Sequence, residues 1–356
     1  MAMSRVAHFD LHHTRFLDAA GDVVGDLPEC ARDANVLRTL YRWMVLTREF
    51  DTRAVTLQRT GQLGTYPSCL GQEAVGVGLG HAMESRDVFV PSFREQGAQL
   101  VRGVTPTELL LYWGGDERGS DFAGPREDFP VNVPIGSQAG HAAGVALAIR
   151  LRGEARAVVC ALGDGATSKG DFYEAMNMAG TWQLPLVFVV NNNAWAISVP
   201  RAAQSAAETL AQKAIAAGFG GEQVDGNDVI AVQHATGQAL ARARAGGGPS
   251  LVEAVTYRLS DHTTADDASR YRPEEEVSAA WQAEPISRLR TFLSDISGWG
   301  RDDEEALIAE CRSRIDAAAS DYLGTPPQPA RAMFDYLYAE LPAPLRAQYD
   351  ALAGED

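Results

Sequence analysis

Two polar clusters in the middle of the chain have residue types that could hold a ligand. A Gly-Asp-Gly turn containing Asp164 follows the apolar run 157–162, and Asn191–Asn193 follows the apolar run 186–190. Asp164 and Asn193 are 29 positions apart (193 − 164), about the length of one strand–helix–strand unit. If the two runs are consecutive parallel strands, both clusters lie at the same edge of a sheet, where ligands bind in open α/β folds.

The chemistry of these clusters favours a diphosphate held through a metal ion. Backbone N–H groups near Gly165, Ala166 and Thr167 would point outward at the start of a helix, which suits a phosphate group. Asp164 would repel that phosphate unless a cation lay between them. A carboxylate, an amide oxygen and a nearby backbone carbonyl form a hard oxygen set that suits Mg²⁺. Either cluster alone is more often an ordinary turn, so the combination carries the prediction.

The surrounding pattern predicts the elements that would position these clusters. The runs 157–162, 186–190 and 251–257 are expected to be buried strands, alternating with helices at 171–182 and 208–217. This alternation is typical of βαβ units, so we predict an α/β fold with a doubly wound parallel sheet.

The 356 residues divide into three predicted parts. Residues 1–30 are expected to form an N-terminal arm. Residues 31–272 form the α/β domain, and its first helix is expected from Ala31 to Thr60, where apolar residues recur at helical spacing. Residues 273–356 form a charged, helical C-terminal extension, which is expected to pack on the domain or on a partner.

Further motifs accompany the two clusters in order along the chain. They are RTGQLGTYPSCLGQEAVGVGL (59–79), VPSFREQG (90–97) and TYRLSDHTTADDASRYR (256–272). Together with GDG and NN, they resemble the α subunit of thiamine-diphosphate-dependent 2-oxo acid dehydrogenases. The resemblance covers almost the whole chain. It implies the thiamine-diphosphate-binding fold and the cofactors thiamine diphosphate and magnesium.

The resemblance also assigns roles by position. Asp164, Asn193 and the backbone carbonyl of Trp195 match the magnesium ligands of the family. Phe93 stands where many members have tyrosine, so one hydroxyl contact is missing, while Arg94 retains a charge-assisted bond to the diphosphate. The positions matched to cofactor binding are Phe93, Arg94, Val133, Ile135, Gly163, Asp164, Gly165, Ala166, Asn193, Arg258 and His262.

His262 matches a catalytic histidine, and a histidine can donate to a keto oxygen or exchange protons near neutral pH. The implied reaction is oxidative decarboxylation of a 2-oxo acid with reductive acylation of a lipoyl group. We favour pyruvate as the substrate because the N-terminal region and the ELPAPLRAQY tail look most like pyruvate-type subunits. A branched-chain 2-oxo acid is the alternative.

Thr263 stands where mammalian relatives carry a phosphorylated serine, and we interpret it as an ordinary loop hydroxyl.

The implied partners are a β subunit, which would supply the cofactor-activating glutamate in an α₂β₂ heterotetramer, and a lipoyl acyltransferase component.

A net charge of −16 argues against nucleic-acid binding. The four scattered cysteines indicate a reducing compartment. No apolar run reaches the roughly 20 residues that span a membrane, and no signal core begins the chain, so we expect a cytoplasmic protein.

Two other functional classes fit the sequence less well. Gly76, Gly78 and Gly80 look superficially like the loop of a nicotinamide-dependent oxidoreductase, but no buried strand precedes them and the third glycine is misplaced. We interpret them as small residues that let helices approach closely. A silent binding subunit is disfavoured because the matched residues are intact. We interpret His81 and His141 as structural, and we expect no metal at His12–His13.

Overall fold

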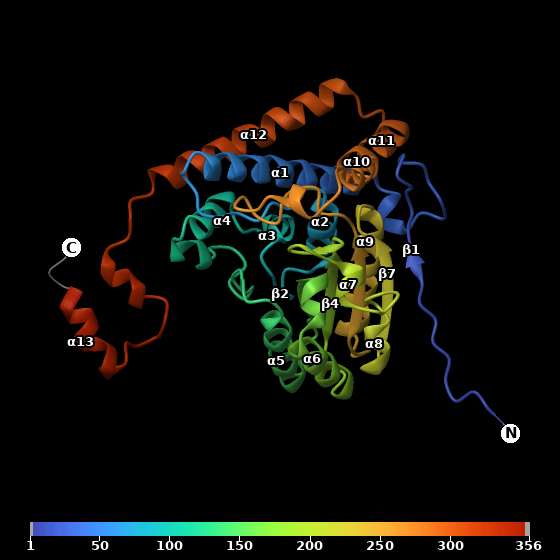
Figure 1. Cartoon of the computed structure of the whole chain (residues 1–356), viewed down its shortest axis with the longest axis horizontal. Coiled ribbons are helices and arrows are strands. Elements are labelled where there is room, and N and C mark those ends of the chain that lie inside the picture. Colours follow the sequence, from blue (N-terminus) through green and yellow to red (C-terminus); the bar gives the residue numbers. More distant parts are fainter. Residues whose placement is uncertain (1–2, 353–356) are drawn as a thin grey trace.

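The computed structural model describes residues 3–352, which form a parallel sheet covered by helices on both faces (Figure 1). The strand order is β1-β7-β8-β4-β3-β2, and every pairing in this sheet is parallel. Its strands are β1 (His13–Thr14), β2 (Val88–Val90), β3 (Val158–Gly163), β4 (Leu186–Asn192), β7 (Gly220–Asp225) and β8 (Ser250–Val255). A separate antiparallel hairpin joins β5 (Trp195–Ala196) to β6 (Val199–Pro200).

The helices give the order expected for an α/β chain with a helical C-terminal part. The α-helices are α1 (Ala34–Arg59), α2 (Glu73–Ala82), α3 (Gln96–Arg102), α4 (Pro106–Trp113), α5 (Ser137–Arg152), α6 (Gly170–Thr181), α7 (Arg201–Gln204), α8 (Lys213–Ala216), α9 (Val229–Arg244), α10 (Glu274–Trp281), α11 (Pro285–Ser297), α12 (Arg301–Gly324) and α13 (Ala343–Ala351). Short 3₁₀ helices are η1 (Glu29–Ala31), η2 (Glu117–Ser120), η3 (Asp164–Ser168), η4 (Ala268–Arg270) and η5 (Ala330–Phe334).

The two faces of the sheet are buried against different helices. In β3, alternate residues point to opposite faces, because side chains alternate along a strand. Val158 and Cys160 pack with α5 and α6 in one hydrophobic core. Val159 and Ala161 pack with α2 and α9 in another. Helices on both faces of a parallel sheet confirm the predicted doubly wound α/β fold.

One predicted helix is wrong. The segment 208–217 is helical only from Lys213 to Ala216. The backbone N–H groups of Leu210 and Ala211 donate instead to the buried carboxylate of Glu253, at 2.8 and 3.0 Å. A side chain from a strand distant in sequence therefore satisfies donors that a longer helix would have used internally.

The glycines of α2 have the packing role that their size predicts. A Cβ atom on Gly78 would lie 2.8 Å from Cβ of Val232 in α9, and one on Gly80 would lie 3.0 Å from Cα of Ala98 in α3. Larger residues would push these helices apart. Gly78 and Gly80, two residues of the glycine stripe Gly76, Gly78 and Gly80, therefore allow close helix packing, as predicted.

The chain ends are tied to the domain differently. The N-terminal segment reaches the sheet edge, where Asp228 accepts the backbone N–H groups of Phe16 and Leu17 at 2.8 and 2.9 Å. Helices α11 and α12 share a hydrophobic core with α1. Beyond α12 the chain extends away from the sheet to α13 (Figure 1). Within residues 3–352, no helix is long and apolar enough to cross a membrane.

Candidate active site

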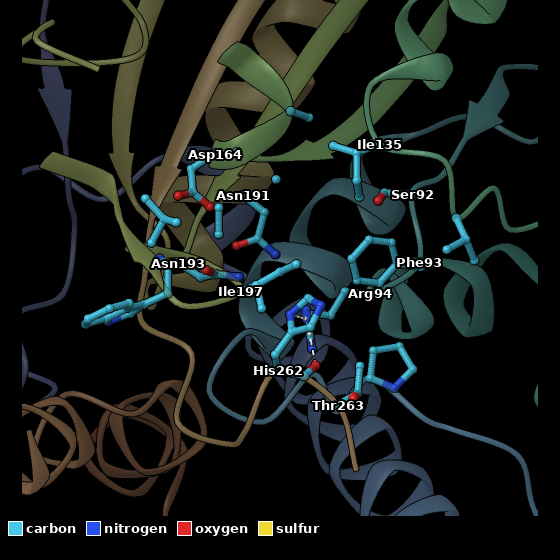
Figure 2. A pocket seen from close by; sticks show the side chains of 18 of the residues that line it. Ser92, Phe93, Arg94, Ile135, Asp164, Asn191, Asn193, Ile197, His262 and Thr263 are labelled. Atoms are coloured by element: carbon cyan, nitrogen blue, oxygen red, sulfur yellow. Dashed lines mark hydrogen bonds between the residues drawn. The ribbon is translucent and has the colours of Figure 1, made fainter. Parts of the chain in front are cut away.

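A pocket of about 720 Å³ opens where β3 and β4 end, at the sheet edge that the sequence predicted. This volume suits a small-molecule ligand or cofactor. Figure 2 shows Asp164, Asn191 and Asn193 on one side and Ser92 and Phe93 on the other. The lining residues include every predicted site residue except Arg258: Phe93, Arg94, Val133, Ile135, Gly163, Asp164, Gly165, Ala166, Asn193, Trp195 and His262.

The turn after β3 differs in one respect from expectation. Residues Asp164–Ser168 form the 3₁₀ helix η3, and the longer helix α6 begins only at Gly170. A helical turn does begin after β3, but it is 3₁₀ rather than α-helical, and the helix predicted at 171–182 is α6. The turn is still compact, because the hydroxyl of Thr167 donates to the carbonyl of Asp164 at 2.7 Å and Lys213 donates to the carbonyl of Thr167 at 2.7 Å.

The three residues predicted to hold the metal, Asp164, Asn193 and Trp195, line one pocket. Asp164 and Asn193 are 4% and 6% exposed, so their oxygens are almost closed to bulk solvent. Asn193 Oδ1 accepts the backbone N–H of Trp195 at 3.2 Å, and Asp164 Oδ2 accepts from Gln204 Nε2 at 3.0 Å. Among residues 3–352 no three His, Cys, Asp or Glu side chains form a metal cluster. The candidate set is instead one carboxylate, one amide oxygen and one backbone carbonyl.

Burial changes the electrostatics of this set. The pKa of Asp164 is raised by desolvation, although the hydrogen bond from Gln204 partly offsets this. A buried carboxylate is costly unless a positive partner compensates it. No Lys or Arg is paired with Asp164 among the described ion pairs. A divalent cation would supply that compensation.

Arg94 and His262 lie together in the lining of the pocket, where Arg94 supplies a positive charge. Arg94 Nη2 lies 3.2 Å from Nδ1 of His262 and donates to the His262 backbone carbonyl at 3.0 Å. The guanidinium also donates from Nη1 to the carbonyl of Ser68 at 2.5 Å. Burial and the neighbouring Arg258 lower the pKa of Arg94 to about 10, so it is a cation at neutral pH.

The contacts of His262 define its protonation. An arginine can only donate, so Nδ1 facing Arg94 accepts, and the neutral ring carries its proton on Nε2. Burial, Arg94 and Arg258 lower the pKa of His262 to about 4. At neutral pH, His262 is therefore an uncharged hydrogen-bond donor rather than the group titrating near neutrality that its residue type suggested.

The pocket fits a magnesium diphosphate group in shape as well as in charge. A Cβ atom on Gly165 would lie 2.6 Å from Cβ of Ala196, so only glycine allows the turn to lie against the β5–β6 hairpin. Asn191 Oδ1 is buried without a hydrogen-bond partner among residues 3–352 and lines the same pocket. Within residues 3–352 the pocket has a buried acceptor without a hydrogen bond, a carboxylate without an ion pair, and the Arg94 guanidinium, a set that matches a cation and an anion bound together.

A family model described as "Dehydrogenase E1 component" matches residues 41–329. The chain belongs to this family. The 3-methyl-2-oxobutanoate dehydrogenase subunit alpha of Mycobacterium tuberculosis is 44% identical over 330 residues, which cover 93% of this chain and 89% of the relative. The pyruvate dehydrogenase E1 component subunit alpha of Staphylococcus aureus is 40% identical over 338 residues, which cover 94% and 91%.

These relatives confirm the resemblance seen in the sequence: the chain is an E1 α subunit of a 2-oxo acid dehydrogenase. Its six-stranded parallel sheet is the core of the thiamine-diphosphate-binding fold of E1 components. The family match includes β2, β3 and β4 together with the loop that carries His262.

Arg258 of this E1 α subunit lies behind the pocket rather than in its lining. It is fully buried and donates to the carbonyls of Trp195 and Ile197, at 3.3 and 2.8 Å. It also donates to the hydroxyl of Tyr271 at 2.8 Å. Arg258 thereby connects the loop after β8 to the β5–β6 hairpin, which includes the predicted carbonyl ligand.

Sequence reasoning assigned no role to several residues that contact the site. Gln204 donates to Asp164, Gln72 contacts Asn193, and Glu95 lines the pocket with its pKa raised to about 7 by burial. Their signal in the sequence is weak, because a glutamine or glutamate is usually exposed.

The remaining candidates lie outside the pocket. His81 is half-buried and has its pKa lowered by burial, while the ring of His141 lies 6.0 Å from that of Phe129. His13 Nδ1 lies 3.0 Å from Oε1 of Gln223. All four cysteines are free, in line with the absence of paired spacing in the sequence.

Proposed function

We propose that this E1 α subunit binds the magnesium diphosphate end of thiamine diphosphate and uses His262 in acyl transfer to a lipoyl group. The observation that carries the proposal is that Asp164, Asn193, Trp195 and Arg94 line one pocket and are all buried. The chemistry for removing carbon dioxide from a 2-oxo acid is supplied by thiamine diphosphate when it is bound.

The chain's own residues would bind and orient. Asp164, Asn193 and the Trp195 carbonyl would hold Mg²⁺ as hard oxygen ligands. Arg94 would neutralise phosphate charge, and the turn at Gly165 allows backbone N–H groups to approach it. His262, neutral and protonated on Nε2, would donate a hydrogen bond from Nε2 to a substrate oxygen.

The substrate is either pyruvate or a branched-chain 2-oxo acid. The sequence motifs favoured pyruvate. The identity to the 3-methyl-2-oxobutanoate enzyme (44%) is slightly above that to the pyruvate enzyme (40%), which supports the branched-chain alternative. A competition assay between pyruvate and 3-methyl-2-oxobutanoate measures the ratio of kcat/KM directly. A ratio above one for pyruvate supports the sequence-based choice, and a ratio below one replaces it.

The printed names of both relatives describe an alpha subunit, which supports a β partner for this chain as well. We propose that the partner supplies the glutamate that activates the cofactor, in an α₂β₂ assembly that acts on a lipoyl acyltransferase. Native mass spectrometry of the chain from its own host tests this. Two copies of each subunit with thiamine diphosphate and magnesium support it, whereas full decarboxylase activity of the chain alone contradicts it. The cytoplasmic location stays a prediction.

A further inference from the structure

Three buried amide side chains from two distant segments form one hydrogen-bonded unit beside the pocket. Gln72, which directly precedes α2, presents Oε1 to Nδ2 of Asn193 at 2.9 Å and to Nδ2 of Asn191 at 3.2 Å. All three residues are at most 6% exposed. Asn191 and Asn193 lie next to Asp164 in the pocket wall (Figure 2).

The direction of these amides is fixed by a group that cannot be reversed. The backbone N–H of Trp195 can only donate, and it donates to Asn193 Oδ1. Asn193 must therefore present Nδ2 to Gln72. Gln72 must in turn present its oxygen, and the only group that Asn191 can offer to that oxygen is Nδ2.

This arrangement leaves an oxygen at the site without a protein partner. Asn191 Oδ1 is buried and has no hydrogen bond within residues 3–352, and neither does Gln72 Nε2. Buried polar atoms in folded proteins are nearly always satisfied, so an exception in a pocket wall indicates a ligand. One glutamine oxygen thus holds two amide nitrogens and leaves Asn191 Oδ1, as well as a lone pair of Asn193 Oδ1, available to a ligand.

We propose that Gln72 is a positioning residue for the cation site. Gln72 does not bind the cation. It fixes the orientation of the Asn193 side-chain amide, whose oxygen binds the cation, and it also fixes the orientation of the Asn191 amide. The inference rests on the proposed function, because it assumes that Asn193 is a Mg²⁺ ligand. Partners of this kind orient metal ligands, and losing one typically weakens metal binding about 10- to 100-fold.

The test measures Mg²⁺ affinity rather than turnover. The tagged chain and its variants are purified from the host with the partner they carry, and Mg²⁺ is titrated at fixed thiamine diphosphate by calorimetry. Gln72→Met removes the acceptor and should raise the apparent Kd for Mg²⁺ about 10- to 100-fold. Gln72→Glu keeps an acceptor for both amides and should restore near wild-type affinity. Gln99→Met, at a buried glutamine outside the pocket, should leave the affinity unchanged.

Equal Mg²⁺ affinity in Gln72→Met and wild type overturns the proposal, as does a Gln72→Glu variant that binds as weakly as Gln72→Met. If Gln72→Met does not fold, Gln72→Asn, which is one methylene shorter and cannot reach both amides, should show the same weakening. A wild-type chain without Mg²⁺-dependent cofactor binding would overturn the proposed function, and this inference with it.

Discussion

Arg94 contacts His262 twice, through Nδ1 at 3.2 Å and through the backbone carbonyl at 3.0 Å. The two residues are 168 positions apart in the chain. The backbone N–H of His262 is held as well, because it donates to Asp266 at 3.0 Å. The backbone of residue 262 is therefore held from both sides and the ring is held through Nδ1, while Nε2 makes no hydrogen bond within residues 3–352.

Replacing His262 by alanine should separate binding from chemistry. We expect His262→Ala to bind thiamine diphosphate and Mg²⁺ like the wild type, because neither Asp164 nor Asn193 hydrogen-bonds to its side chain and Arg94 keeps its bonds to the backbone carbonyls of residues 262 and 68. Lipoyl acylation should fall by about 10²- to 10⁴-fold, the usual value of a positioned proton donor. Acylation rates and cofactor titrations are measured side by side with His141→Ala as the control. Unchanged acylation in His262→Ala would refute the role.

The lowered pKa of His262 predicts a specific pH dependence of stability. Its folded-state pKa of about 4 lies below the ordinary value of 6.5, so folding favours the neutral ring. The resulting stabilisation is complete above pH 6.5 and is lost as the pH falls toward 4, because the unfolded chain takes up a proton first. Melting temperatures between pH 7 and 4 should drop more steeply for the wild type than for His262→Gln. Parallel curves would contradict the shifted pKa.

Replacing a buried aspartate by asparagine should have different effects on stability at Asp164 and at Asp228. Burial raises the pKa of both. Asp228 accepts backbone N–H groups from two segments, so Asp228→Asn should cost about 1–3 kcal/mol of unfolding free energy. The side chain of Asp164 accepts from Gln204 and forms no ion pair within residues 3–352, and desolvation outweighs the attraction of Arg258, so Asp164→Asn should leave the melting temperature of the ligand-free chain equal or higher.

The same two variants, Asp164→Asn and Asp228→Asn, should also differ in their affinity for Mg²⁺. Asp164→Asn should weaken Mg²⁺-dependent cofactor binding by roughly 100-fold or more, since outer partners alone are worth about 10- to 100-fold. Asp228→Asn should bind the metal normally once folded. Calorimetric titration and thermal denaturation on the same samples distinguish the two effects. An Asp164→Asn variant that is unstable but binds normally would mean that Asp164 is structural.

Gly165 offers a steric test of the turn after β3. In Gly165→Ala the new methyl would lie 2.6 Å from Cβ of Ala196, so the hairpin must shift, at a cost of about 1–3 kcal/mol. Thiamine diphosphate binding should weaken in parallel. Gly237→Ala is the matched control, since its methyl meets nothing within 4 Å and alanine favours a helix. Equal melting temperatures for the two variants would argue against the close approach.

The local pattern of the sequence was enough to place the core of the site. Asp164 and Asn193 each follow an apolar run, and β3 and β4 pair in parallel with Gly163 opposite Asn191. Parallel neighbours end at the same edge, so the two clusters had to meet. The glycine stripe of α2 was predictable for a similar reason, because helix packing depends on residue size at helical spacing.

Only the tertiary structure decided how these side chains are oriented and charged. Gln72 lies 121 positions from Asn193, and Arg94 lies 168 from His262, so no local pattern could pair them. Burial among such distant partners makes His262 neutral and places Arg258 behind the pocket. The local sequence located β3, β4 and β8, whereas strand order, hydrogen-bond direction and pKa depend on which segments the fold brings into contact.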